Sequence, residues 1–210
     1  AGIKTPLVIV NSCANPDTAA DIVASGDADS FKKMLSHNLS KLEGEKFDYA
    51  VTACASCTET IEKFWPQYAE GRQKEQAERI AAKTLDISAF VADVLGVEPA
   101  KAPAERREKV TYHESCHLAK SLGVRIQPRK LIEANPGCEL VEMREPDRCC
   151  GCGGSFTLTH YGLSKKIGGR KRDNIAASGA ETVACGCPAC MMQISNMLAL
   201  NGDAVKVEHV

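Results

Sequence analysis

The sequence has no excess of charge of either sign. Its 26 lysines and arginines nearly balance its 27 aspartates and glutamates, which leaves a formal net charge of -1. A chain so close to neutral creates no general field that would attract DNA, RNA or an anionic membrane surface. We therefore expect no nucleic-acid partner.

Long apolar runs are also missing. The longest are short stretches such as Leu7–Val10, and the apolar segment around Phe90 carries Asp86 and Asp93. A membrane-spanning helix needs about 20 mostly apolar residues, so we expect no transmembrane segment. The sequence shows no basic and then apolar leader, and it opens at Ala1. We expect a cytoplasmic fragment of a longer protein, with membrane association only through partners.

Cysteine, by contrast, is abundant. The chain has 11 cysteines in 210 residues, and this odd number rules out a complete set of internal disulfides. In a reducing compartment, clustered cysteines indicate metal binding or catalysis.

Short β-rich runs alternate with longer segments of helical periodicity. This alternation predicts an α/β fold with a mainly parallel sheet. The predicted strands are Leu7–Asn11, Tyr49–Ala53, Lys109–His113, Glu139–Met143, Thr182–Cys185 and Val205–His209. The predicted helices are Asp29–Leu42, Ser56–Tyr68, Lys74–Leu95, Pro128–Ala134, Tyr161–Ser178 and Pro188–Leu200.

The pattern also predicts two pseudo-symmetric lobes, residues 1–98 and 106–210, joined by an exposed segment with two prolines at 97–105. In both halves, a helix with two adjacent lysines precedes a strand that runs into Cys-x-x-Cys. The first lobe is truncated or degenerate, because Cys13-Ala14 stands where the second lobe has Cys149-Cys150 and nothing matches Cys116.

Five cysteines of the second lobe form the most informative pattern. They are Cys116, the adjacent pair Cys149 and Cys150, and the pair Cys187 and Cys190. The last pair begins a predicted helix, whose free amides and positive end favour thiolates and lower their pKa. The adjacent pair needs a tight turn to aim both sulfurs one way, and the glycine-rich residues 151–154 supply it.

Those glycines also let backbone N–H groups approach sulfur atoms. Five thiols exceed the four that a cubane cluster or a structural zinc needs, so one thiol is spare or the cluster is not an ordinary cubane. The residue chemistry favours iron-sulfur, but zinc and free redox thiols stay open.

Three segments carry a resemblance to a known family. Tyr112–Leu118, Cys149–Gly154 and Cys187–Cys190 resemble the CCG, or cysteine-rich, domain family. That family includes the cluster-bearing subunit of heterodisulfide reductase and the iron-sulfur subunits of glycolate oxidase and lactate-utilisation oxidases. The His-Glu-Ser-Cys-His opening is closer to the latter branch.

The resemblance implies that Cys116, Cys149, Cys150, Cys187 and Cys190 bind a four-iron four-sulfur (4Fe-4S) cluster, which in heterodisulfide reductase is noncubane. It implies electron transfer with a flavoprotein that oxidises a hydroxy acid such as glycolate or lactate. Longer family members also carry a ferredoxin-like domain, and this chain has no matching Cys-x-x-Cys-x-x-Cys run. Electrons would then come from a flavoprotein or ferredoxin-like partner, or from a missing segment.

Two other functions stay open as alternatives. One is reduction of a disulfide at a noncubane 4Fe-4S cluster, and the other is a zinc-stabilised structural or assembly module without turnover. In the first lobe, Cys13, Cys54 and Cys57 match only part of the motif, so a lost site, zinc or a second cluster are all open.

The remaining candidates have simpler interpretations. We expect Cys138, Cys152 and Cys185 to be structural, with Cys152 and Cys185 as alternative thiols for the site. We expect a backbone group to satisfy His113 or His117, and the alternatives are that a histidine binds the metal, moves protons or hydrogen-bonds to sulfur. The basic run Lys165, Lys166, Arg170, Lys171 and Arg172 reads as a solvated helix face, with docking of an acidic redox partner as the alternative.

Overall fold

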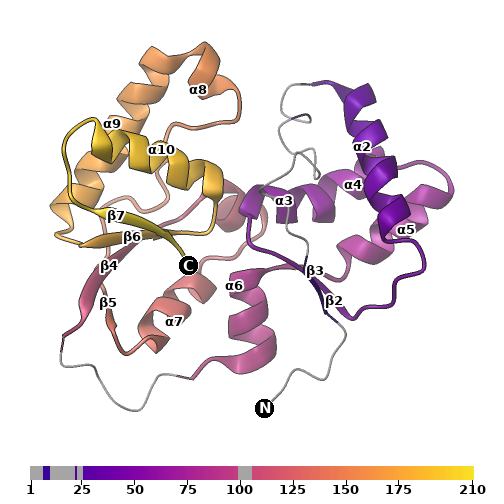
Figure 1. The fold of residues 1–210 in the computed structure, drawn as a ribbon, viewed down its shortest axis with the longest axis horizontal. Helices are drawn as coiled ribbons and strands as arrows, with labels where there is room; N and C mark the ends of the chain where they lie inside the picture. Colours follow the sequence, from indigo (N-terminus) through magenta and orange to yellow (C-terminus); the bar gives the residue numbers. More distant parts are fainter. Residues whose placement is uncertain (1–6, 10–21, 23–25, 99–105) are drawn as a thin grey trace. The chain divides into compact units, whose positions relative to one another are not determined.

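The computed structural model describes residues 7–9, 22, 26–98 and 106–210. Over these residues the chain is an α/β protein with two small parallel sheets flanked by helices (Figure 1), which confirms the predicted fold class. It divides into two compact units, Ala1–Ile87 and Ser88–Val210. The division lies upstream of the connection expected at residues 97–105, so Phe90–Gly96 is grouped with the second unit.

The first unit holds a sheet in the order β1-β2-β3, with every pair parallel. Its elements are β1 (Leu7–Ile9), α2 (Ala28–Lys41), β2 (Tyr49–Thr52), α3 (Ala55–Glu59), η2 (Thr60–Phe64), α4 (Trp65–Tyr68), α5 (Arg72–Ala81), β3 (Thr84–Asp86) and the first residue of α6 (Ile87–Ala89). Three of them, α3, η2 and α4, follow one another without a break, so the predicted helix Ser56–Tyr68 is confirmed with a π-helical turn at its centre.

Helix α2 shows why this unit folds as it does. Asp27 caps it by accepting a hydrogen bond from the backbone N–H of Ser30 at 3.0 Å. Phe31, Leu35 and Leu39 recur at four-residue spacing and are buried in one apolar cluster with Ile61 and other side chains of the unit. The inner face of α2 is therefore wholly apolar.

The predicted helix Lys74–Leu95 is wrong in its middle. Helix α5 ends at Ala81, Thr84–Asp86 forms β3, which pairs in parallel with β2, and helical structure resumes at Ile87. A buried strand of three residues is too short to show an alternating pattern. Its apolar residue, Leu85, fits the helical spacing of the segments on either side, so the sequence predicts one continuous helix. Pairing with β2 outweighs local helix propensity here.

The second unit holds a four-stranded parallel sheet in the order β5-β4-β6-β7. Its further elements are η3 (Phe90–Gly96), β4 (Glu108–His113), η4 (His117–Ser121), α7 (Ile126–Ala134), β5 (Cys138–Leu140), α8 (Phe156–Thr159), α9 (Tyr161–Ala177), β6 (Thr182–Cys185), α10 (Pro188–Ala199) and β7 (Lys206–His209). Figure 1 shows α9 and α10 on one face of this sheet and α7 on the other. The chain therefore winds to both faces of the sheet.

The two sheets share a common order once β5 is set aside, because β1-β2-β3 corresponds to β4-β6-β7. In both units, the central strand leads into a helix that opens with Cys-x-x-Cys. The counterpart of β1 is thus β4, the strand before Cys116. The topology does not favour the match of Cys13 with Cys149, since Cys149 follows β5 and β5 has no counterpart among the described strands of the first unit.

Across the described ranges, no helix combines the length and apolar character that a membrane span requires.

Candidate metal centre

The Cys187–Cys190 pair begins helix α10. Cys187 is the residue before the first helical turn, with an extended backbone (φ -141°, ψ 113°), and Pro188 follows at a position where its missing N–H costs little. Strand β6 places this turn at the carboxyl edge of the sheet. Cys187 and Cys190 are both buried.

The Cys149–Cys150 pair lies in the tight glycine-rich turn that the sequence predicts. Gly151 has a φ of +91°, and a Cβ atom there would lie 2.6 Å from the backbone oxygen of Ser164. Only glycine fits this position. The N–H of Gly151 donates to the Sγ of Cys149 at 3.3 Å, as expected for a backbone amide that approaches sulfur. Cys149 is exposed, whereas Cys150 is buried.

Helix α9 holds this turn in place through polar contacts. The hydroxyl of Ser164 donates to the oxygen of Gly151 at 2.7 Å. The ammonium of Lys171 donates to the oxygens of Glu145 at 2.8 Å and Pro146 at 3.0 Å. Lys171 is only 1% exposed, and this burial lowers its pKa to about 8. The prediction of a fully solvated basic face is therefore wrong at Lys171, although Lys165, Lys166 and Arg170 are exposed.

The Cys116 segment is tied to the same turn. The N–H of Glu114 donates to the oxygen of Pro146 at 3.0 Å. The buried carboxylate of Glu114 is paired with Arg125 at 2.9 Å and Arg129 at 2.7 Å. These contacts fix the start of η4, where Cys116 is exposed.

The sulfurs of the second unit share one electrostatic environment. Burial raises the pKa of Cys116, and the charges of Cys150 and Cys187 raise it further. Hydrogen bonding from Cys149, Cys190 and His113 lowers the pKa of Cys150. Hydrogen bonding to Cys150 raises the pKa of Cys149 and Cys190.

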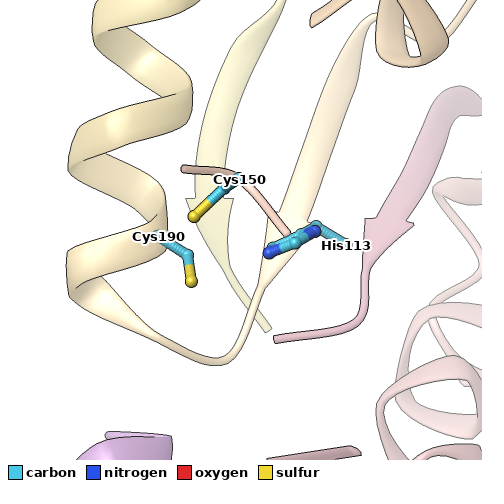
Figure 2. Close-up of side chains that lie close together, drawn as sticks. All are labelled: His113, Cys150 and Cys190. Carbon is cyan, nitrogen blue, oxygen red and sulfur yellow. The ribbon is translucent and has the colours of Figure 1, made fainter. Parts of the chain in front are cut away.

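A histidine completes this group. Nitrogen or sulfur atoms of His113, Cys150 and Cys190 all lie within 4.8 Å of one another (Figure 2). The prediction that a backbone group satisfies His113 is wrong, because no backbone group bonds to either ring nitrogen within the described part of the chain and the ring instead interacts with Cys150. Buried thiols together with an imidazole suit a soft or borderline metal, and therefore zinc or an iron-sulfur cluster.

The other predicted residues lie in different settings. Cys138 packs against the apolar cluster of the second sheet, as a structural residue would. The thiol of Cys185 donates to the oxygen of Cys187 at 3.5 Å. Cys152 is buried beside the turn, and its pKa is raised first by this burial and then by the charge of Cys150. In the first unit Cys54 and Cys57 are buried. Cys13 lies outside the described residues.

Sequence reasoning missed the buried role of Lys171, whereas it gave an interaction of His113 with the site only as an alternative. Lys171 lies four residues before Ile175 and seven after Ser164, the spacing of a buried helix face. That spacing predicts burial of Lys171, whereas the surrounding run of basic residues predicts a solvent-exposed helix face.

Comparison with known sequences places this chain among cysteine-rich domains. The sequence model of the CCG family, described as a cysteine-rich domain, matches residues 18–62 and 110–195, which together make up more than half of the chain. The chain belongs to the CCG family. The second matched segment contains all five cysteines of the motif, and the first contains Cys54 and Cys57.

Similar proteins extend this result. A fumarate reductase (CoM/CoB) subunit of Methanothermobacter marburgensis is 32% identical over 199 residues, which are 94% of this chain and 37% of that protein. Lactate utilization protein A of Exiguobacterium sp. is 32% identical over 189 residues, 89% of this chain and 76% of that protein. Its namesake in Bacillus subtilis is 32% identical over 165 residues, 78% of this chain and 68% of that protein. The chain spans little more than a third of the first relative and about three quarters of the second.

Proposed function

We propose that the second unit binds an iron-sulfur cluster through Cys116, Cys149, Cys150, Cys187 and Cys190, and that the chain is a redox subunit or domain. The observation that carries this proposal is geometric: the sulfurs of Cys150 and Cys190, which come from two distant segments, lie with a ring nitrogen of His113 within 4.8 Å of one another. The charges of Cys150 and Cys187 also contribute to the raised pKa of Cys116, which ties the third segment to the same group. When bound, such a cluster accepts and donates single electrons.

Two features favour iron-sulfur over zinc in the second unit. A structural zinc takes four ligands, and five thiols with a nearby imidazole exceed that number. The amide of Gly151 already contacts a sulfur, as backbone amides around iron-sulfur clusters do. The surplus of thiols also supports a noncubane 4Fe-4S cluster.

The leading role is electron transfer with a flavoprotein that oxidises a hydroxy acid of the glycolate or lactate type. Its support is similarity to the lactate utilization proteins. Because the cluster would exchange electrons with another protein, a flavoprotein or ferredoxin-like redox partner is part of the proposal. A cytoplasmic location also belongs to it, since free clustered thiols persist in reducing compartments.

Disulfide reduction is the second candidate. Cys116 and Cys149 are exposed while Cys150, Cys187 and Cys190 are buried, so one side of the centre is open to a substrate sulfur. Similarity to a fumarate reductase (CoM/CoB) subunit points the same way. A disulfide that is reduced by the isolated, pre-reduced chain would favour this candidate over electron relay.

In the first unit we propose no more than a partial site, at Cys13, Cys54 and Cys57. Zinc is the alternative to a second cluster there, and a zinc-stabilised assembly module is the alternative for the whole chain. Colourless protein with stoichiometric zinc would establish that alternative.

The test is anaerobic purification followed by iron, sulfide and zinc analysis and electron paramagnetic resonance. We expect iron and sulfide in cluster stoichiometry, with Cys187→Ser strongly depleted in both because one thiolate is lost. The matched control is Cys138→Ser, which lies in β5 outside the cysteine group and should keep the wild-type content. Unchanged iron and an unchanged spectrum in Cys187→Ser would remove Cys187 from the ligand set.

A further inference from the structure

His113 is a buried polar side chain that packing alone does not explain. It ends strand β4, its side chain is buried, and the residue is 1% exposed. Within the described residues no backbone group satisfies Nδ1 or Nε2, and the polar neighbour with which the ring interacts is Cys150. A buried polar group without a partner costs about 1–3 kcal/mol, so folded proteins rarely keep one unless a bound group compensates it.

The strand directs His113 toward the cysteines. Side chains alternate between the faces of a strand, and the preceding residue, Tyr112, packs into the apolar cluster that includes Ile132 of α7. His113 therefore faces the opposite side of the sheet, where α10 and the Cys149–Cys150 turn lie. Figure 2 shows its ring beside the sulfurs of Cys150 and Cys190.

The spacing of these atoms suits a shared metal ion. The nitrogen and the two sulfurs lie within 4.8 Å of one another. Around a tetrahedral metal with bonds of about 2.0–2.3 Å, neighbouring donor atoms lie roughly 3.5–3.8 Å apart. A contraction of about 1 Å, within reach of small side-chain rotations, brings the three atoms to bonding geometry.

We propose that His113 is a nitrogen ligand of the metal centre, bound to the same metal ion as Cys150 and Cys190. This inference rests on the proposed function and deepens it, because it adds an imidazole to the proposed thiolate ligands. A neutral imidazole at a position where a sixth thiolate could bind leaves the cluster with one negative charge fewer. It thereby raises the reduction potential, as histidine ligation does in other iron-sulfur centres.

The experiment uses the anaerobically purified chain labelled with nitrogen-15 histidine. Pulsed electron paramagnetic resonance of the paramagnetic cluster detects whether a nitrogen is bonded directly to iron. We expect the strong coupling of a coordinated imidazole, shifted by the isotope, and its complete loss in His113→Gln. His209→Gln is the matched control, because His209 ends strand β7 of the same sheet and bonds to the oxygen of Val210.

A second variant guards against a folding defect in the first. His113→Cys restores a metal-binding side chain, so we expect it to retain iron, to lose the nitrogen coupling and to shift the midpoint potential downward. A wild-type protein that contains iron and sulfide but shows no coupling from directly bonded histidine nitrogen overturns the inference.

Failure of the proposed function gives a different result. If the centre contains zinc and no iron, the iron-sulfur assignment fails, and zinc X-ray absorption then counts the nitrogen ligands. Loss of one nitrogen from zinc in His113→Gln would support His113 as a ligand, and an unchanged nitrogen count would overturn it.

Discussion

The two Cys-x-x-Cys segments have nearly the same local geometry but different surroundings. Cys54 and Cys187 each precede a helix with an extended backbone, φ -147° and ψ 115° against φ -141° and ψ 113°. In both units, the last residue of the preceding strand donates to the oxygen of that cysteine, Thr52 at 3.1 Å and Cys185 at 3.5 Å. The Cys-x-x-Cys motif alone therefore indicates the start of a helix and does not by itself indicate a metal site.

The surroundings supply what the motif lacks. Among the described residues, only the second unit inserts β5 and the Cys149–Cys150 turn between the paired strands, and it ends β4 with His113. The corresponding position in the sequence of the first lobe is Val10, the residue after β1, so that lobe has a valine where the second has a histidine. The comparison teaches that the grouping of cysteines with a histidine in the second unit comes from the inserted turn and the neighbouring strand.

The helices before the two motifs differ in the same sense. Helix α2 buries Phe31, Leu35 and Leu39, whereas the buried residues of α9 are Ser164, Gly168, Lys171 and Ile175. The first helix packs on an apolar core. The second supports a polar turn, and its small and polar residues make the contacts that hold the cysteines.

The sharpest way to break the comparison is to remove the same cysteine from each unit. Cys190→Ser removes a thiolate from the proposed centre, and we expect the iron content to fall on the order of tenfold. Cys57→Ser makes the corresponding change in the first unit and should leave the iron of the second unit in place. Iron and sulfide analysis of both variants decides the matter, and equal losses would contradict the assignment of the centre to the second unit.

The next largest effect should come from the buried lysine of α9. Lys171→Met leaves the oxygens of Glu145 and Pro146 without their donor, so we expect the free energy of unfolding to fall by about 2 kcal/mol. Chemical denaturation of the metal-free protein measures this change. Lys166→Met, an exposed position on the same helix, should change stability by less than about 0.5 kcal/mol. Similar values for the two variants would show that Lys171 does not hold the turn.

A smaller effect should distinguish the carboxyl groups of the two units. Burial raises the pKa of Glu62 in the first unit to about 7, whereas hydrogen bonds from Arg148 and Asn174 lower the pKa of Glu145 in the second to about 2. Between its unfolded value of 4.5 and about 7, the folded protein holds a proton on Glu62 that the unfolded chain releases. The contribution of Glu62 to stability therefore falls as the pH rises through this range.

Glu62→Gln removes that dependence. Glu62 is only about half buried, so solvent screening reduces the free energy that its pKa shift represents. We expect the free energy of unfolding of the variant to rise by roughly 1 kcal/mol relative to wild type between about pH 4.5 and pH 8. Denaturation of both proteins at the two pH values measures the gain. A constant difference across this range would show that Glu62 titrates normally.

The smallest effect should follow from copying the first unit into the second. Cys185→Thr gives β6 the residue that ends β2, and the hydroxyl can make the same bond to the oxygen of residue 187. We expect unchanged iron content and spectrum, because Cys185 acts through this hydrogen bond. Iron loss comparable to that of Cys190→Ser would instead make Cys185 a ligand.

The parts of the fold with strong periodicity were predictable. Long helices such as α2 and α9, and strands such as β6 that run into a cysteine motif, lie within one or two residues of their predicted bounds. Strand β3 was not predictable, because three buried residues between helices carry no period of their own. Its existence depends on pairing with β2, which is a tertiary effect.

The candidate site divides in the same way. Spacing and glycine content single out five cysteines, because those residues must lie next to each other in short motifs. The roles of His113 and Lys171 depend on which face of a strand or helix is turned inward, and neighbouring charged residues in the sequence obscure that information.

The bond from the amide of Glu114 to the oxygen of Pro146 couples two parts of the chain that are far apart in sequence. It joins the segment before Cys116 to the segment before Cys149, and these two cysteines are the exposed thiols of the group. A change that displaces either backbone segment should therefore disturb both thiols at once.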